Sequence, residues 1–185
     1  MMKEILTHAA ERMDKSLEAL REEISKIRTG KATTALLDGV KVEYYGALTP
    51  LNQMASVTVI DAHTLGIQPW DKTGLNAIDK AVRSADLGLN PSNDGMIIRV
   101  PIPALNEERR REIVKLVKRF GEEARIAIRN IRRDANEHLK KAEKEDHVSE
   151  DERIKAEKDV QDMTNKHIEH IDEMLKHKEK EVMEV

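Results

Sequence analysis

Seven arginines and lysines in the segment 106–142 have the side-chain chemistry and the spacing of an anion-binding surface. With 100° between successive residues of an α-helix, they fall within a sector of about 100°. They define a predicted basic ridge, which consists of Arg111, Lys115, Lys118, Arg125, Arg129, Arg132 and Arg133. We expect the ridge to face almost opposite to the apolar stripe of the same helix, away from the core. Guanidinium groups stay charged and bind phosphate oxygens through paired hydrogen bonds, so the ridge predicts a phosphate-bearing partner.

The alternative for the basic ridge is a solvated helix face whose charges pair with acids one turn away. Between Arg111 and Arg133, Glu122 is the only acidic residue within the sector, while Glu108, Glu112 and Asp134 lie at its margins. We therefore expect little internal pairing, which leaves the ridge available to an external anion.

Charge is segregated along the chain, although the net charge is only −3. Segment 106–142 carries 12 basic and 7 acidic residues (net +5), whereas 143–185 carries 8 and 15 (net −7). The first segment suits an anionic partner, and the second would repel stray nucleic acid. This pattern favours one specific docking face over general binding to duplexes, because general duplex binders are usually basic overall.

Aromatic residues narrow the kind of nucleic acid that is expected. Single-strand binding needs aromatic side chains on which bases stack, and the basic segment has only Phe120, on its apolar face. Tyr44, Tyr45 and Trp70 lie in the middle of the chain, where we expect them to pack in a core. A rigid basic helix without stacking groups fits a folded RNA that is read by its backbone shape.

Residues for catalysis or metal binding are not assembled in this sequence. Phosphate-loop, serine-hydrolase and zinc-protease motifs are absent. His167 and His170 lie three residues apart near Glu173, but a surface or partly buried role is the expectation for them. Carboxylates are abundant but lie on predicted solvated helices, which do not tune them for acid–base work. We therefore predict a binding protein that is not an enzyme and holds no metal or cofactor.

Three apolar stripes, with steps of three and four residues, predict three long helices. The first runs to about Thr29 and stops at Gly30, where a left-handed residue would end it. The second begins at an Asn106 N-cap, and the third begins at a capping box on Ser149. The connection 145–148 is short, so these two helices are expected to be antiparallel neighbours. Their charge density is too high for isolated helices, so the three stripes predict a bundle.

The middle of the chain holds all five prolines and six of the eight glycines, and its apolar residues alternate with a period of two. We expect strands around 40–44, 57–59, 65–67 and 96–100, a short helix around 75–85, and turns at 61–64 and 90–95. The predicted fold class is α+β, a long three-helix bundle (1–30 and 105–185) with an inserted small β/α/β domain (31–104).

The chain crosses between these domains twice, and two slender connections make a two-stranded hinge. The hinge is predicted at Gly30, Lys31, Pro103, Ala104 and Leu105. Relative motion of the two domains is the expectation for such a connection.

No cysteine is present, which excludes disulfides and thiolate metal sites and fits a reducing, cytoplasmic location. The first residues are charged and amphipathic, unlike a secretory signal, and no stretch approaches ~18 apolar residues. A monomer without membrane contact is expected.

Several short motifs follow one another in a specific order along the whole chain. They are KIRTG at 26–30, VEYYG at 42–46, TPL at 49–51, SADLGLNP at 84–91, IRVP at 98–101, IRNIRRDA at 128–135 and VSEDE at 148–152. In this order and spacing they resemble the bacterial ribosome recycling factors. The resemblance implies a three-helix bundle joined by a hinge to a smaller domain, in agreement with the fold class above.

The resemblance also implies a function in protein biosynthesis, after translation termination. Family members bind the post-termination ribosome between its subunits and separate the subunits together with elongation factor G, which hydrolyses the GTP. Arg129 and Arg132, with Arg133 beside them, match the family's arginines that contact large-subunit ribosomal RNA. Lys31 and Thr34 depart from the family pattern, which usually has arginine and proline there.

Two other functions are less well supported by the sequence. A coiled-coil scaffold or chaperone would bind protein partners through an apolar groove, with little salt dependence and tolerance of arginine loss. A hydrolase using exposed carboxylates has no supporting constellation of residues. The basic ridge, the inserted domain and the resemblance favour the translation factor.

Overall fold

The computed structural model describes residues 1–145 and 147–184, which form two compact units. The first unit is Met1–Ile27 with Arg110–Val185, and the second is Arg28–Arg109, so the chain passes between them twice. The predicted boundaries, after residues 30 and 104, fall a few residues inside the second unit. Long helices in the first unit and a small sheet in the second confirm the α+β class.

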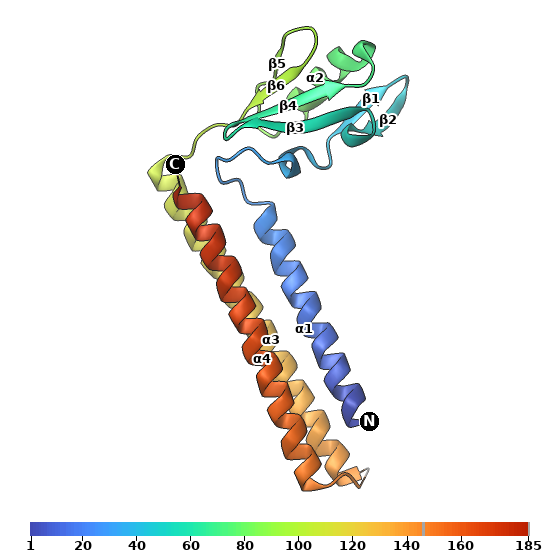
Figure 1. Cartoon of the computed structure of the whole chain (residues 1–185), viewed down its shortest axis with the longest axis vertical. Helices are drawn as coiled ribbons and strands as arrows, with labels where there is room; N and C mark the ends of the chain where they lie inside the picture. Colours follow the sequence, from blue (N-terminus) through green and yellow to red (C-terminus); the bar gives the residue numbers. More distant parts are fainter. Residues whose placement is uncertain (146, 185) are drawn as a thin grey trace. The chain divides into compact units, whose positions relative to one another are not determined.

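The first unit consists of three long helices that run side by side (Figure 1). They are α1 (Met2–Ser25), α3 (Glu107–Glu145) and α4 (Glu150–Met183). α3 runs antiparallel to α4, as predicted, although Asp146 of the connection lies outside the described residues. Within the described ranges, none of the helices has an apolar stretch that is long enough to cross a membrane.

Local capping explains where the helices begin. The backbone N–H of Arg109 donates to Asn106 Oδ1 (2.7 Å), which confirms Asn106 as the cap of α3. Ser149 and Glu152 form the predicted capping box: the Ser149 hydroxyl accepts from the Glu152 N–H (3.2 Å) and the Glu152 carboxylate accepts from the Ser149 N–H (3.0 Å). These bonds satisfy backbone donors that have no partner inside the helix.

The predicted end of the first helix is wrong by several residues. α1 ends at Ser25, and Lys26, still in the right-handed helical region, donates its N–H to the Glu22 carbonyl. Gly30 does adopt a left-handed conformation (φ +80°), but it lies beyond the helix, where the chain turns. The glycine therefore marks a turn after the helix and does not cap it.

The three helices bury their apolar stripes against one another, and each fully buried aliphatic side chain contributes about 1.5–3 kcal/mol before entropic costs. The stripe of α3 is made of Ile113, Val117, Gly121, Ala124, Ile128, Ile131, Ala135, Leu139 and Ala142. Facing it are Ala9, Met13, Leu20 and Ile24 of α1, and Ala156, Val160, Ile171, Leu175 and Val182 of α4.

Gly121 has no explanation in the sequence, since glycine costs a helix interior about 1 kcal/mol relative to alanine. The structure supplies one. A Cβ atom at this position would lie 2.2 Å from Leu175 Cδ1 and 3.0 Å from Leu175 Cγ. Leu175 is buried in the contact with α3, so the missing side chain of Gly121 makes room for it.

The second unit contains a hairpin and an antiparallel sheet. The hairpin is β1 (Lys41–Tyr44) with β2 (Ala47–Pro50), and the sheet has the order β3-β4-β6-β5. Its strands are β3 (Ala55–Asp61), β4 (Thr64–Pro69), β6 (Ile98–Pro101) and β5 (Ser92–Asn93), and one helix, α2 (Leu75–Ser84), follows β4. β2 is not among the strands predicted from the sequence, and β5 lies in the segment 90–95 that is predicted to be a turn.

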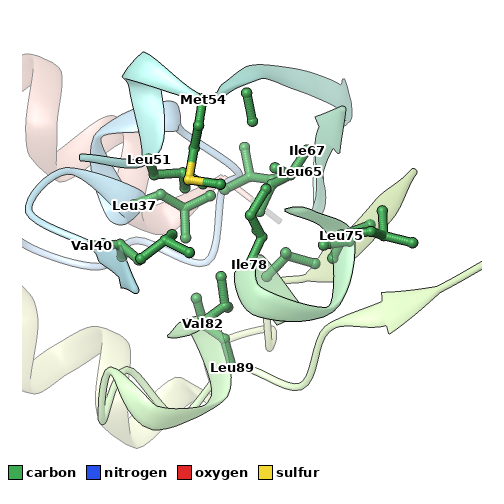
Figure 2. Packing of buried hydrophobic residues seen from close by; sticks show 14 of the residues in the cluster. Leu37, Val40, Leu51, Met54, Leu65, Ile67, Leu75, Ile78, Val82 and Leu89 are labelled. Atoms are coloured by element: carbon green, nitrogen blue, oxygen red, sulfur yellow. The ribbon is translucent and has the colours of Figure 1, made fainter. Parts of the chain in front are cut away.

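One apolar core holds the second unit together (Figure 2). It combines alternate residues of the strands with the inner face of α2 and with the segments before β1 and β3. The labelled side chains are Leu37, Val40, Leu51, Met54, Leu65, Ile67, Leu75, Ile78, Val82 and Leu89. The period-two and period-3.6 patterns thus meet in a single core, as expected.

The expected core packing of the aromatic residues is wrong for Tyr45 and Trp70. Tyr45 is 82% exposed because it forms the two-residue hairpin turn with Gly46, where both residues have positive φ (+50° and +76°). Trp70 is 67% exposed, and it lies in a bend directly after Pro69, the last residue of β4. Only Tyr44 is half-buried.

The turn before β6 is organised by Asp94. Its carboxylate accepts from the backbone N–H groups of Ile97 (2.8 Å) and Met96 (2.9 Å), and from the Arg99 guanidinium (2.7 Å). These bonds, above all the one from Ile97, lower the pKa of Asp94 from 3.8 to about 2.

This pKa predicts a pH-dependent contribution to stability. The unfolded chain binds a proton at Asp94 more readily than the folded chain does, so the stabilisation is present above pH 3.8 and is lost as the pH falls toward about 2. We expect Asp94→Asn to lower the free energy of unfolding near pH 6, and we expect this difference to shrink between about pH 4 and pH 2. Denaturant unfolding of both proteins across this range measures it, and a difference that does not change with pH would contradict the assignment.

Candidate nucleic-acid interface

α3 presents the basic ridge on the side of its cylinder next to the buried stripe. If Ile113 is placed at 0°, steps of 100° put the buried stripe at about 0–80°, Arg132 at about 100° and Arg125 at about 120°. The other five ridge residues fall at about 140–200°. They are exposed, whereas Arg125 and Arg132 are half-buried. The prediction that the whole ridge faces almost opposite to the stripe is therefore wrong for these two arginines.

Arg125 is paired with acids on two helices. Its guanidinium donates to Asp172 Oδ1 of α4 from Nη2 (2.6 Å) and Nε (3.1 Å), and to Glu122 Oε2 of α3 from Nη1 (3.2 Å). The bonds to Asp172 and Glu122 raise the pKa of Arg125 above its ordinary value, the former having the larger effect. Glu122 was recognised in the sequence as an acid within the sector. Asp172 was missed because it lies 47 residues away, on another helix.

Arg132 also contacts α4, but its acceptor there is neutral. Its Nη1 donates to Gln161 Oε1 at 3.1 Å, and the Gln161 amide nitrogen donates to Asn165 Oδ1 at 2.9 Å. The Nε atom of Arg132 is buried and has no hydrogen-bond partner among the described residues. The guanidinium is thus held in place, and no carboxylate of residues 1–145 or 147–184 neutralises its charge.

The remaining ridge residues keep their charges accessible. Arg129 makes one long contact, with Glu122 Oε1 at 3.5 Å, and its side chain is 44% exposed. Lys115, Lys118 and Arg133 have no hydrogen-bond or ion-pair partner in the part of the chain that the structure describes. We call Lys115, Lys118, Arg129 and Arg133 the free cations of the ridge, since Arg129 has only this one long contact and the other three have none among the described residues. Arg111 is exposed at the first turns of α3.

The residues predicted as a hinge all lie inside the second unit. The segments around Gly30 and Ile102 both contact the turn after β3: His63 Nδ1 lies 2.8 Å from the Gly30 carbonyl oxygen, and the Ile102 N–H donates to the His63 carbonyl (2.7 Å). A Cβ atom on Gly30 would lie 3.4 Å from Leu105 Cγ. Lys31, Pro103 and Ala104 lie beside these contacts in the chain, and the hinge itself stays a prediction.

His167 takes the partly buried position that the sequence indicated. One ring nitrogen lies 2.8 Å from Asp14 Oδ1 of α1, and the other lies 2.7 Å from the Met163 carbonyl oxygen. Over residues 1–145 and 147–184, no three histidine or acidic side chains converge as a metal site would require. His167 therefore connects α1 to α4.

The chain is similar to known proteins over its whole length. The family model "Ribosome recycling factor" matches residues 20–183. The ribosome-recycling factor of Azoarcus sp. (strain BH72) is 50% identical over 185 residues, and that of Halalkalibacterium halodurans is 53% identical over 185 residues; both alignments cover 100% of each chain.

Two solved structures are similar over the whole chain. A solution structure of the ribosome recycling factor has a TM-score of 0.80 at 41% identity, with 100% of this chain and 98% of that chain covered. Models for the T. thermophilus ribosome recycling factor and E. coli elongation factor G bound to the E. coli post-termination complex have a TM-score of 0.67 at 48% identity, with 100% of both chains covered. The full-length identity and the matching fold lead to one conclusion: this chain belongs to the ribosome recycling factor family.

Proposed function

We propose that this chain separates post-termination ribosomes into subunits, and that it binds large-subunit ribosomal RNA through the free cations of the ridge. The observation that carries the proposal is the row of accessible charges on α3 in a chain of this family. From Lys115 to Arg133 the row extends about 27 Å at 1.5 Å per residue, which is long enough to meet several phosphates. Binding of this kind reads the shape of a folded RNA backbone and needs no stacked bases.

The protein partner that we propose is elongation factor G, which would use the GTP. The T. thermophilus factor that is similar to this chain is described together with that partner on the post-termination complex, which supports the assignment. In this proposal the chain itself holds no cofactor and breaks no bond. Movement at the predicted hinge would let the second unit respond to the GTPase while α3 stays on the RNA.

Light scattering of post-termination ribosomes tests the proposal. Addition of this protein with elongation factor G and GTP is expected to lower the scattered intensity, because separated subunits scatter less light than intact ribosomes. Omission of the protein, and replacement of GTP by a non-hydrolysable analogue, are the controls. Unchanged scattering, under conditions in which a known recycling factor separates the subunits, would overturn the proposal.

A scaffold or chaperone would behave differently in a binding measurement. Attraction between the free cations and phosphates releases counterions, so affinity for the large subunit should fall steeply as salt rises. Contact through apolar surfaces would depend little on salt. Affinity that stays constant between 50 and 200 mM salt would therefore favour the scaffold, since this is about the range over which phosphate binders weaken by orders of magnitude.

A further inference from the structure

Two ridge arginines, Arg125 and Arg132, reach across to α4, and they meet acceptors of different charge there. Arg125 meets the carboxylate of Asp172 at 2.6 Å, whereas Arg132 meets the amide oxygen of Gln161 at 3.1 Å. Both acceptors are on exposed residues of the same helix. On α4 the two sites therefore differ in whether the acceptor carries a negative charge, and Arg125 has in addition the carboxylate of Glu122 on α3.

A charged acceptor and a neutral one have opposite consequences for phosphate binding. The carboxylates of Asp172 and Glu122 already neutralise Arg125, so an incoming phosphate would have to displace an anion that is held at hydrogen-bond distance. An amide oxygen orients a guanidinium but brings no charge. Arg132 keeps its full positive charge, and it uses one of its five N–H donors on Gln161.

A second hydrogen bond orients Gln161. Its amide nitrogen donates to Asn165 Oδ1 at 2.9 Å, one turn further along α4, which turns its oxygen toward Arg132. The guanidinium of Arg132 is also partly enclosed, since its Nε atom is buried. A long side chain that is held in this way loses less conformational entropy when it binds an anion than a freely rotating one does.

We infer that the α4 residue opposite each arginine decides which half-buried ridge arginine binds the RNA backbone: Gln161 positions Arg132 for a phosphate, and Asp172 withholds Arg125 from one. The inference rests on the proposed function and deepens it. Gln161 is a positioning residue, because it acts through Arg132. The binding surface is thus the four free cations plus Arg132, without Arg125.

Two substitutions exchange the charge of the α4 acceptor: one gives Arg132 a charged acceptor, and the other gives Arg125 a neutral one. Gln161→Glu keeps the shape of the side chain and gives Arg132 an anionic partner, so affinity for isolated large ribosomal subunits should fall about tenfold, the effect of one charged hydrogen bond. Asp172→Asn removes one anion from Arg125 and should raise affinity by up to about tenfold. The slope of log affinity against log salt should decrease by about 0.9 in the first variant and increase in the second.

Matched controls separate this effect from a change in net charge. Gln53→Glu in the second unit and Asp159→Asn on another face of α4 make the same charge changes at exposed positions. Both should leave affinity and salt slope close to those of the unchanged protein. Adding Arg132→Gln to Gln161→Glu should cause little further loss, because the arginine is already neutralised. A helix-content and unfolding measurement on each variant excludes a folding defect.

The outcomes also separate this inference from the proposed function. If Gln161→Glu and Asp172→Asn bind like the unchanged protein while Arg133→Gln weakens binding, the selection by α4 is refuted and the ridge still binds RNA. If Arg133→Gln has no effect either, the proposed function fails, and the inference fails with it.

Discussion

The double variant Arg129→Gln/Arg133→Gln is expected to bind large ribosomal subunits about 100-fold more weakly than the unchanged protein. Each residue is exposed, and the two lie one helical turn apart among the free cations of the ridge. A hydrogen bond to a charged group contributes about 1.5–3 kcal/mol, so the loss of two such contacts corresponds to roughly two orders of magnitude or more in affinity. Subunit separation should slow in parallel. A binding titration at fixed salt measures the change.

The matched control is a double variant on another helix. Lys15→Gln/Arg21→Gln also removes two positive charges, from exposed positions on α1. Its affinity for large subunits should be within a few-fold of that of the unchanged protein. The unfolding free energy of each double variant should stay within about 1 kcal/mol of that of the unchanged protein, as is usual for pairs of exposed substitutions. Equal weakening by the two double variants would mean that net charge, and not the ridge, controls binding.

Gly121→Ala is expected to destabilise the helical unit by up to about 2 kcal/mol, although alanine is the better helix former. The added methyl group would lie 2.2 Å and 2.9 Å from the two methyl carbons of Leu175 and 3.0 Å from its Cγ atom. Because Leu175 is buried, relief of these contacts requires either that it enters another rotamer or that α3 and α4 move apart. Overpacking of this kind typically costs more than the ~1 kcal/mol that alanine contributes to the helix.

The effect of Gly121→Ala on stability should change sign in a protein that also carries Leu175→Ala. Leu175→Ala removes the obstructing atoms and by itself should cost about 2–5 kcal/mol, as for other buried leucines. In that background Gly121→Ala should stabilise the unit by up to about 1 kcal/mol, because only the helix preference remains. Denaturant unfolding of the four proteins completes the cycle. Stabilisation by Gly121→Ala in both backgrounds would show that the helices have room for a side chain there.

The sequence predicts the helical unit well because its signals are local. Apolar spacing, the Asn106 cap and the Ser149 capping box each depend on residues within a few positions of one another, and the structure contains all of them. The end of α1 was misplaced for the same reason. A glycine is a strong local signal, but the chain leaves the helix before it reaches Gly30.

The partners of the ridge could not be predicted in the same way. Whether Arg125 meets an acid depends on which face α4 turns toward α3, and on the register that brings Asp172 opposite it. The angular position of Arg125 and Arg132 next to the buried stripe was available from the sequence, and it would have indicated contact with a neighbouring helix. It could not indicate whether the neighbour would be a carboxylate or an amide.

The environments of Gly121 and of the aromatic residues also depend on contacts with residues that are distant in the sequence. The reason for Gly121 is a leucine on another helix, so no window of sequence around the glycine contains it. Core packing is expected for Tyr45 and Trp70 because of their place in the middle of the chain. The hairpin turn that exposes Tyr45 and the end of β4 that precedes Trp70 are visible only once β1, β2 and β4 are paired.

The central claim is that the outer face of α3 lies against large-subunit ribosomal RNA, and a tethered cleavage reagent tests it most directly. The chain has no cysteine, so Lys118→Cys on the ridge and Lys15→Cys on α1 each give one attachment point for an iron chelate that cuts nearby RNA. With ribosomes bound, the probe at position 118 is predicted to cut large-subunit RNA at a few clustered sites, and the probe at position 15 to cut it weakly or elsewhere. Strong cleavage from position 15 together with none from position 118 would contradict the account.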